Sequence, residues 1–418
     1  MTPLISSAQR RPPPEPGAPA IPPMDLRDSK EDAAFREEVR TWIGEHLVGD
    51  FARAGDIGGP GREHQGFEIR LAWEQVLGDE GWTCLGWPVE WGGRGATIAQ
   101  QVIWAEEYVR ASCPARVGVV GEGLLGPTLI AYGTEEQKRR FLQPIARGRE
   151  LWCQGYSEPD AGSDLANVRT TAVLDGDEWV INGQKIWTSL AQWAEWCFVL
   201  CRTDRDSVRH KGLSYLLVPM KQSGVELRPI TQLTGTSEFN EVFFDEARTS
   251  ADLVVGEVGE GWRVALATLA FERGVALLGH QLRFSRELDQ VIEVTKRRGT
   301  NTDPVVRQRL ARSWETLSIL RMNILRSLRG LEGPLSTPEA SIAKLFWGTW
   351  HRGLGELAMD VLGMESTVAD AMPYELSELQ SLFLFSRADT IYGGSNQIQR
   401  NIIAERVLGL PPEPKGTS

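Results

Sequence analysis

The spacing of apolar residues changes twice along this chain, and that double change constrains the fold more than any other feature. Up to about residue 150, apolar residues recur at steps of three and four, as in DSKEDAAFREEVRTWIGEHL, which is typical of capped amphipathic helices. Residues 151–256 instead hold short runs rich in β-branched and aromatic residues between turns, such as TTAVLDGDEWVINGQKIWTS. Ala- and Leu-rich helical patterns return after residue 257. The order helices, strands, helices predicts an α+β protein of several domains.

The same changes set the expected domain boundaries in a chain of 418 residues, a length that allows two or three packed units. We predict a Pro-rich solvated tail over 1–24, an N-terminal α-domain over 25–150, a middle β-domain of barrel or sandwich type over 151–256, a C-terminal helical domain over 257–410 and a short tail over 411–418.

Individual elements follow from the same patterns. The expected helices besides the first are Arg70–Glu80, Ala99–Ala111, Leu124–Tyr132, Glu135–Ala146, one long helix from Gly261 to about Arg298, Val305–Leu328, Pro338–Leu362 and a terminal helix near Ser395–Leu408. A β-hairpin is expected from strands at Thr170–Leu174, Trp179–Asn182 and Lys185–Ser189, with a turn at Asp175-Gly176-Asp177 and a break around Asn182-Gly183.

Composition excludes several classes of protein. Hydrophobic residues make up 41% and charged residues 24% of the chain, which excludes a mostly disordered or collagen-like protein. A net charge of −11 disfavours nucleic acid or anionic membrane as the main partner. The sequence contains no run of about 20 apolar residues, so no membrane span is predicted. The five cysteines are scattered without a CxxC pair, and no histidine spacing is typical of a metal site, so we expect no metal and a reducing, cytoplasmic location.

The first candidate site segment is QGYSEPDAGSD, residues 154–164. Small residues and hydroxyls alternate there, and Gly162 permits unusual backbone angles, so N–H groups and Ser157 and Ser163 hydroxyls can face a polar or anionic ligand. Ordinary turn chemistry between a helix and a strand explains the same letters, and the segment alone does not decide between the two.

The second candidate segment is INGQKIWTS, residues 181–189. Trp187 beside the hydroxyl residues Thr188 and Ser189 at a strand end can wall a planar ring and bond its edge. A half-buried strand also favours Trp and Thr, so this segment alone is a weak signal.

The third candidate is Glu272, an acidic residue inside the otherwise apolar stretch LATLAFERGVALLG. Desolvation in such surroundings raises the pKa of a carboxyl toward the range useful for a general base. The alternative is that Glu272 pairs with Arg273 at a helix surface.

The fourth candidate is IYGGSNQIQRNIIAERVLGLP, where Gly393 and Gly394 lead into a helix that begins near Ser395. A glycine turn at a helix N-terminus is a natural place for phosphate oxygens. It is not a GxGxxG motif after a strand, so a Rossmann site is disfavoured, and a Ser cap alone explains the same residues.

Taken together, these segments resemble the acyl-CoA dehydrogenase family. GYSEPDAGSD resembles the family's first signature, INGQKIWTS its flavin-side strand and IYGGSNQIQRNIIAERVLG its C-terminal signature. The resemblance runs from about Asp28 to Leu410 and includes GWPVEWGG and GTEEQKRRFLQPIARG. It implies an N-terminal helical domain, a middle β-domain and a C-terminal four-helix bundle, which matches the order read from the periodicity.

The resemblance implies FAD as cofactor. In the β-domain, Ser157 is similar to the hydroxyl residue that bonds the flavin ring, Trp187 would stack beside the ring, Ser189 would lie near its N5 atom, and Ser163 is similar to a residue near the pyrophosphate and the thioester's pantetheine arm. The full set of cofactor residues implied is Gln154, Tyr156, Ser157, Ser163, Trp187, Thr188, Ser189, Arg298, Gly393, Gly394, Ser395 and Gln397.

Part of this set implies an assembly. Arg298 falls on the arginine that reaches the FAD diphosphate of a neighbouring subunit, and Ser395 and Gln397 occupy positions that hold FAD at the subunit junction. A homo-oligomer follows, usually a tetramer in this family, with a dimer as the alternative. One departure is Asn301 in KRRGTNTDPVV, at a position that the resemblance assigns to the adenosine end of the site and where the family usually has an aromatic residue.

A second departure concerns the catalytic base. The family's commonest base is a Glu after the Ile-Tyr of the C-terminal signature, where this chain has Gly393. Isovaleryl- and long-chain-type enzymes carry Gly there and supply the Glu from a bundle helix directly before an Arg, a position held here by Glu272 before Arg273. The resemblance therefore implies Glu272 as base and Arg273 as a substrate-site residue.

The implied reaction is α,β-dehydrogenation of an acyl-CoA thioester to the trans-2-enoyl-CoA, as in fatty-acid β-oxidation. Glu272 takes the α-proton while the β-hydrogen passes as hydride to flavin N5, hydrogen bonds stabilise the developing enolate, and an electron-transfer flavoprotein reoxidises the flavin. The alternatives are an oxygen-using acyl-CoA oxidase or flavin monooxygenase, and a non-catalytic flavin-binding partner. Short branched, medium, aromatic, steroid-side-chain and carrier-tethered acyl groups all remain open.

Overall fold

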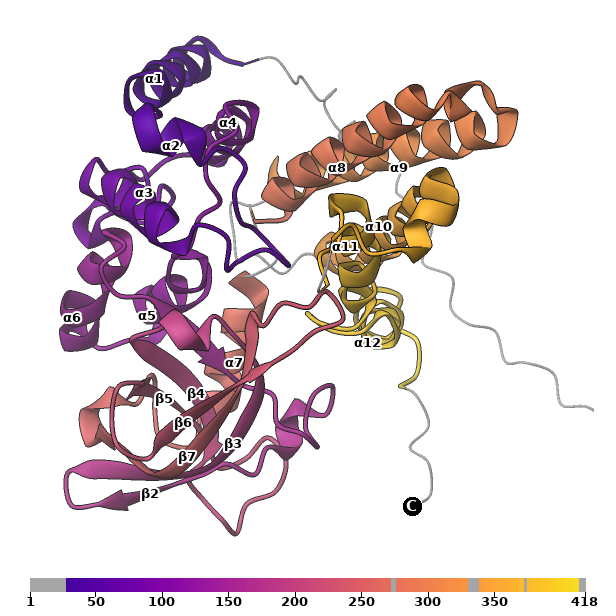
Figure 1. Ribbon diagram of the computed structural model, residues 1–418. Helices are drawn as coiled ribbons and strands as arrows, with labels where there is room; N and C mark the ends of the chain where they lie inside the picture. The colour runs from indigo at the N-terminus through magenta and orange to yellow at the C-terminus, as the bar shows by residue number, and fades with distance from the viewer. Residues whose placement is uncertain (1–27, 272–275, 330–337, 372–373, 413–418) are drawn as a thin grey trace, which may run out of the picture.

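The computed structural model describes residues 28–271, 276–329, 338–371 and 374–412. Figure 1 shows a helical region, a β-domain below it and a second helical region beside both. The order of elements is the predicted one, with helices first, then strands, then helices. No helix in these ranges combines the length and the apolar character needed to cross a membrane.

The N-terminal helices form because apolar residues share one face and capping residues satisfy the first turns. Ser29 caps the first helix by accepting from the Asp32 N–H, and Phe35, Val39 and Trp42 are buried as the spacing predicts. The elements of this domain are α1 (Lys30–His46), α2 (Gly49–Arg53), α3 (Phe67–Asp79), α4 (Ile98–Arg110), α5 (Gly126–Tyr132) and α6 (Glu135–Ala146).

Within the described ranges, seven strands form one sheet in the order β1-β4-β2-β3-β7-β6, with β5 paired to β4. Their bounds are β1 (Trp152–Gly155), β2 (Thr171–Asp175), β3 (Glu178–Ser189), β4 (Trp196–Arg202), β5 (Leu213–Pro219), β6 (Val225–Ile230) and β7 (Phe239–Ser250). The predicted hairpin is confirmed as the antiparallel pair β2–β3. The predicted break at Asn182-Gly183 is wrong: β3 runs through it, because β7 pairs along its length with irregular register between Ile181 and Gly183.

The C-terminal region is helical. Its elements are α7 (Gly261–Phe271), α8 (Ala276–Arg298), α9 (Pro304–Arg329), α10 (Pro338–Leu362), α11 (Glu378–Phe385) and α12 (Asn396–Ile402). The predicted long helix is described as α7 and α8, and residues 272–275 between them lie outside the described part. The helix α11 was not predicted, although Ser377 and Gln380 form a capping box at its start.

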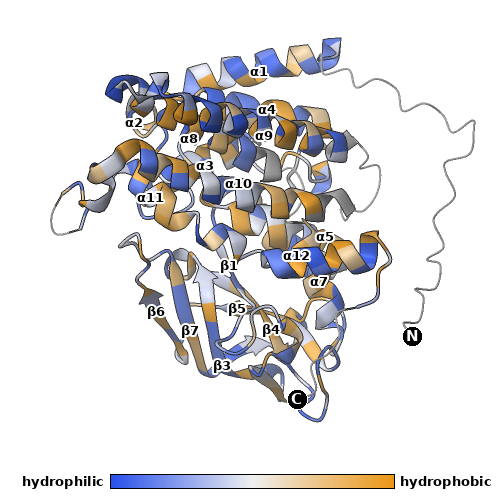
Figure 2. Ribbon diagram, turned by 90° about the vertical axis from the view of Figure 1, so that its right-hand side faces the viewer, coloured by the Kyte–Doolittle hydropathy of each residue, from blue (hydrophilic) through white to orange (hydrophobic). Residues whose placement is uncertain are grey.

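The buried apolar residues form separate clusters, which differ in the domains that they join. One apolar cluster contains residues of the N-terminal domain, the β-domain and α7, among them Leu129, Phe198 and Val264. A separate cluster belongs to α8, α9, α10 and α11, among them Phe284 and Leu354. Figure 2 shows hydrophobic and hydrophilic residues interspersed along the helices, as in amphipathic helices. The N-terminal domain, the β-domain and α7 therefore share one core, and α8–α11 have a separate one. The N-terminal domain and the β-domain also each have a core of their own.

Candidate active site

Two of the predicted site segments meet in the β-domain. The N–H of Ile186 on β3 donates to the carbonyl of Ser157, 2.9 Å away, in the loop after β1. One residue earlier, the Lys185 ammonium donates to the carbonyl of Tyr156 at 3.0 Å. Segments 154–164 and 181–189 are thus joined side by side, as a shared ligand site requires.

A buried ion pair fixes this junction. The Lys185 Nζ lies 2.8 Å from Glu158 Oε1 and also donates to the Leu200 carbonyl at 2.7 Å. Glu158 accepts the Arg169 and Thr170 N–H groups at 2.6 and 2.9 Å. The carboxylate therefore holds the whole loop that carries Ser157 and Ser163 against the strand.

The electrostatics of this pair follow from its burial. Burial raises the pKa of Glu158, but the attraction and hydrogen bond of Lys185 outweigh it, so the net pKa lies below its usual value. Burial lowers the pKa of Lys185, and the attraction of Glu158 offsets only part of that effect. Sequence reasoning missed both residues, although each lies inside a segment that it singled out.

Trp187 stands out by its backbone and its exposure. Its φ of 60° lies in the left-handed region, which is rare for a bulky residue and concentrated at functional sites. The register of β3 against β7 is irregular between Lys185 and Thr188, so this bulge turns the indole away from the sheet. The side chain is 56% exposed and touches Phe239 edge-on, with ring centroids 6.2 Å apart. A large ring held in solvent by a strained backbone is suited to stack on a planar ligand.

Two predicted cofactor residues offer polar atoms without partners. The Gln154 Nε2 and Thr188 Oγ1 atoms are buried and have no hydrogen-bond partner among the described residues. Buried polar groups are nearly always satisfied, so these two atoms are free to bond a ligand or a water molecule. The Thr188 carbonyl, by contrast, accepts the Asn240 side-chain amide at 3.2 Å.

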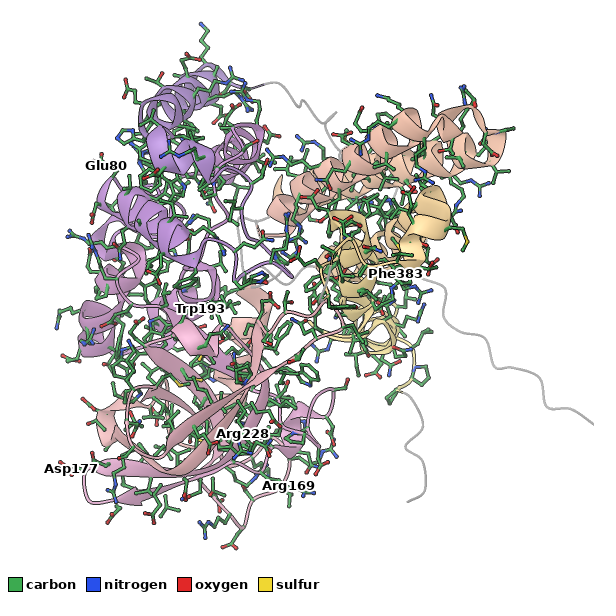
Figure 3. The ribbon with its side chains drawn as sticks, viewed as in Figure 1. Glu80, Arg169, Asp177, Trp193, Arg228 and Phe383 are labelled. Atoms are coloured by element: carbon green, nitrogen blue, oxygen red, sulfur yellow. The ribbon has the colours of Figure 1, made fainter. Side chains whose placement is uncertain are left out.

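The remaining β-domain residues differ in exposure. Ser157 and Ser189 are half-buried, while Ser163 is exposed on the loop after β1. Tyr156 is buried against Phe198 and Tyr215, with ring centroids 5.8 and 6.2 Å away. Figure 3 shows the side chains of this region and labels Arg169, whose N–H Glu158 accepts, and Trp193, which stacks on Phe67 of α3 at 4.3 Å.

The glycine turn lies in the C-terminal region. Gly393 and Gly394 have φ values of 61° and 88°, conformations that glycine adopts without strain. The buried Gln399 donates to the Gly393 carbonyl at 3.2 Å, and a Cβ on Gly394 would lie 2.4 Å from the Gln399 amide nitrogen. Ser395 caps α12 by accepting from the Ile398 N–H, as the sequence predicts.

The other predicted residues are placed as follows. Gln397 is exposed on α12. Arg298 ends α8, at the tip of the hairpin that α8 and α9 extend away from the β-domain, and forms an ion pair with Glu365. The role of Arg298 toward a neighbouring subunit stays a prediction. Glu272 and Arg273 lie outside the described residues.

No metal centre accompanies these segments in the part of the chain that the structure describes, where no three His, Cys, Asp or Glu side chains are grouped to hold an ion. All five cysteines fall in the described ranges, and they are buried and free: Cys84, Cys113, Cys153, Cys197 and Cys201.

Comparison with known proteins identifies the fold. The N-terminal, middle and C-terminal domains of the acyl-CoA dehydrogenase family match residues 29–149, 153–247 and 259–408 of this chain. The chain belongs to the acyl-CoA dehydrogenase family. It is an oxidoreductase with FAD as cofactor, and the predicted fold class and family are confirmed, while the position of the catalytic Glu stays a prediction.

Individual relatives cover nearly the whole chain. Acyl-CoA dehydrogenase IpdE1 of Mycolicibacterium smegmatis is 59% identical over 392 residues, which span 91% of this chain and 98% of that protein. Among solved structures, the Tcur3481-Tcur3483 steroid ACAD aligns with a TM-score of 0.80 and 31% identity over 93% of this chain and all of that one. The ChsE4-ChsE5 complex from Mycobacterium tuberculosis aligns with a TM-score of 0.77 and 30% identity, covering 93% and 100% of the two chains.

The residues of this acyl-CoA dehydrogenase fit its cofactor. Trp187 offers a ring face, and Gln154 and Thr188 offer buried polar atoms that lack partners among the described residues. A flavin needs both, a wall for its planar ring and hydrogen bonds at the ring edge.

Proposed function

We propose that this chain catalyses the α,β-dehydrogenation of an acyl-CoA thioester, with Glu272 as the base that removes the α-proton. The observation that carries the proposal is the junction of the two β-domain segments, where the strained, exposed Trp187 lies beside unsatisfied polar atoms in a chain of this family. FAD, when bound, supplies the acceptor for the β-hydrogen and its electron pair.

The protein's own groups bind, orient and take the proton. Ser157, Trp187, Thr188 and Ser189 hold the cofactor from the β-domain, and Ser163 holds the thioester's pantetheine arm. An α-proton of a thioester is too weakly acidic for an unaided carboxylate, so the negative charge that develops on the carbonyl oxygen must be stabilised. The backbone N–H of Gly393 is suited to that task, because the turn is fixed by Gln399 while no side chain stands there.

We further propose that the acyl group is a steroid-derived one. The support is the similarity to the solved structure described as a steroid ACAD, at 31% identity over 93% of this chain. Arg273 is proposed to contact the substrate. We therefore propose that the enzyme acts in the oxidation of a steroid-derived acyl chain rather than in the β-oxidation of simple fatty acids.

The proposed partners are an electron-transfer flavoprotein as electron acceptor and further subunits. Arg298 at the hairpin tip and Ser395 and Gln397 at α12 are the residues proposed to complete a FAD site between subunits of a tetramer, with a dimer as the alternative. A cytoplasmic location is proposed with them, because the five cysteines are free, as is typical of a reducing compartment.

Anaerobic mixing with a panel of thioesters tests the reaction. Bleaching of the flavin's blue absorption band by steroid-derived CoA thioesters, and not by butyryl- or octanoyl-CoA, is the expected result. Bleaching by straight chains alone would contradict the acyl class. No bleaching by any thioester, with dithionite still able to reduce the flavin, would contradict dehydrogenation and favour a non-catalytic flavin protein. Rapid oxygen consumption during aerobic turnover would favour an oxidase or monooxygenase instead.

Substitution of the base tests its assignment. Glu272→Gln keeps the shape of the side chain but cannot accept the proton, so the bleaching rate is expected to fall about 10²- to 10⁴-fold while FAD stays bound. A matched control is Glu260→Gln directly before α7, whose exposed carboxylate pairs with the nearby Arg263, 3.6 Å away. Wild-type bleaching by Glu272→Gln would show that another group is the base.

A further inference from the structure

A chain of alternating charges runs through the core of the C-terminal helices. Arg283 Nε lies 3.4 Å from Glu287 Oε1, both on α8. The other Glu287 oxygen lies 2.7 Å from His351 Nε2 on α10. The second ring nitrogen of His351, Nδ1, bonds the carboxylate of Asp389. Cation and anion alternate along the four residues, so each charge faces a partner of opposite sign.

This row of alternating charges ends at the turn that contains Gly393. The Asp389 carboxylate also accepts the Tyr392 hydroxyl, and its backbone carbonyl accepts the Lys344 ammonium. Tyr392 directly precedes Gly393, whose carbonyl accepts Gln399 from the other side. The turn is therefore held at both ends by buried side chains, and one of those ends depends on Asp389.

His351 is the residue on which the charge chain depends. Its side chain is 2% exposed and that of Asp389 1% exposed, so neither charge is hydrated. Burial alone would lower the pKa of His351, but Glu287 and Asp389 outweigh it and raise the pKa to about 9. The imidazole is thus cationic at neutral pH, and its loss would leave the buried Asp389 carboxylate without its cation, while Glu287 would keep Arg283.

The neighbouring His280 does not replace the charge of His351. Burial lowers the pKa of His280 to about 4, so this neighbour on α8 is neutral at pH 7. The titratable or charged groups that act on this cluster are His280, Arg283 and Glu287 from α8, Lys344 from α10, Asp389 and Tyr392 from the segment after α11, and Arg62 from the N-terminal domain.

We propose that His351 is a positioning residue for the dehydrogenation: it holds Asp389, which fixes Tyr392 and with it the Gly393 amide where the thioester carbonyl binds. This inference rests on the proposed function, because it concerns the same reaction. A helix-packing role alone would need no continuous link from α8 to the glycine turn. Because the amide must point at the developing negative charge, a small displacement of the turn lowers the rate more than the affinity.

The test compares His351→Gln with His210→Gln in the FAD-loaded enzyme. His210 is an exposed residue of the β-domain beside Trp262, so its substitution controls for the loss of one histidine. For His351→Gln we expect an unchanged ratio of flavin to protein, an unchanged KM and a bleaching rate at saturating thioester lower by about 10- to 100-fold. His210→Gln is expected to match the wild type.

A spectroscopic readout separates positioning from stability. A thioester with a ¹³C-labelled carbonyl and sulfur in place of the β-carbon binds but cannot be dehydrogenated. Infrared difference spectra should show its carbonyl stretch lowered by the enzyme's hydrogen bonds in the wild type, and less so in His351→Gln. The wild-type bleaching rate should also fall as pH rises through about 9, where the pKa of His351 lies. The bleaching rate of the variant should not show this fall.

Tyr392→Phe is the second variant, should His351→Gln fail to fold. It removes only the hydroxyl that Asp389 accepts, and we expect the same loss of carbonyl shift. Wild-type carbonyl frequency and rate in either folded variant would overturn the inference while the proposed function stands. A wild type that no thioester bleaches would instead overturn the proposed function and this inference together.

Discussion

The β-domain and the C-terminal helices are attached to the N-terminal domain in different ways. The β-domain shares its core: Phe141 of α6 packs edge-on against Trp152 and Trp196, with ring centroids 5.3 and 5.1 Å apart. The helices α8–α11 have their own core, against which α4 packs half-buried residues such as Val102, whereas α7 belongs to the shared core. The N-terminal domain, the β-domain and α7 are therefore joined through a common core, against which α8–α11 dock.

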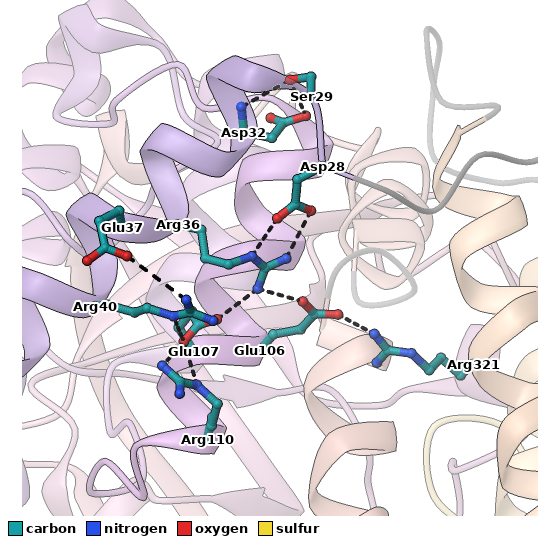
Figure 4. Close-up of polar contacts among 10 residues, drawn as sticks. All are labelled: Asp28, Ser29, Asp32, Arg36, Glu37, Arg40, Glu106, Glu107, Arg110 and Arg321. Atoms are coloured by element: carbon teal, nitrogen blue, oxygen red, sulfur yellow. Dashed lines mark hydrogen bonds and ion pairs between the residues drawn. The ribbon is translucent and has the colours of Figure 1, made fainter.

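Ion pairs at the rim complete that docking. Arg321 of α9 pairs with Glu106 of α4, which also accepts Arg36 of α1 at 3.0 Å (Figure 4). Arg286 of α8 pairs with Asp56 in the same manner. Exposed or half-exposed pairs contribute little stability each, whereas a shared apolar core contributes much more. The cofactor-facing half of the site thus lies in the part joined by the common core, and the glycine turn lies on the part that docks.

The largest loss of stability is expected in the β-domain half of the site, which depends on the buried charge of Lys185. Lys185→Met removes the cation from Glu158 and leaves a carboxylate that is 7% exposed without it. A buried pair broken in this way destabilises a protein by about 3–5 kcal/mol. Denaturant unfolding followed by tryptophan fluorescence measures the loss, and the flavin content of the purified protein should fall with it.

Lys138→Met is the control for that substitution. Lys138 pairs with Glu135 one turn earlier on α6, where the carboxylate is 53% exposed, so a loss below about 1 kcal/mol is expected. Equal losses from the two variants would mean that the Lys185–Glu158 pair does not hold the β-domain site.

A smaller, pH-dependent effect is expected in the docking half. The pKa of His351 is raised from 6.5 to about 9 in the folded chain, so its contribution to stability is complete below about 6.5 and is lost as pH rises through about 9. The pKa difference corresponds to roughly 3 kcal/mol. Melting of wild type between pH 7 and 10 should therefore decline more than that of His351→Gln. Parallel declines would show that His351 does not stay protonated in the folded state.

The sequence predicted the structure correctly where a local pattern of residues determines it. The predicted bounds of Glu135–Ala146 and Pro338–Leu362 agree with α6 and α10, because a capping Thr134 and a first-turn Pro338 mark where these helices begin. The Trp187 segment was singled out for its ring and hydroxyls, and the structure adds its strained bulge.

What could not be predicted depends on residues distant in sequence. Lys185 meets Glu158 across 27 positions and His351 meets Asp389 across 38, and no local pattern records either contact. The predicted break at Gly183 is wrong for the same reason. Asn182 and Gly183 are typical of a hairpin turn, but β3 pairs with the distant strand β7 on both sides of them, and the irregular register leaves a bulge in a continuous strand.

The smallest expected effect tests the docking itself. In a double-mutant cycle of Arg321→Met and Glu106→Gln, we expect a coupling of about 0.5–1 kcal/mol, since the two side chains are 30% and 19% exposed and Glu106 keeps Arg36. Hydrogen exchange should locate the loss in α9 and leave β3 and β4 unchanged, because only the docked helices lose a contact. Faster exchange in the β-domain as well would show that the C-terminal helices belong to the same rigid body, and the two halves of the site would then be equally fixed.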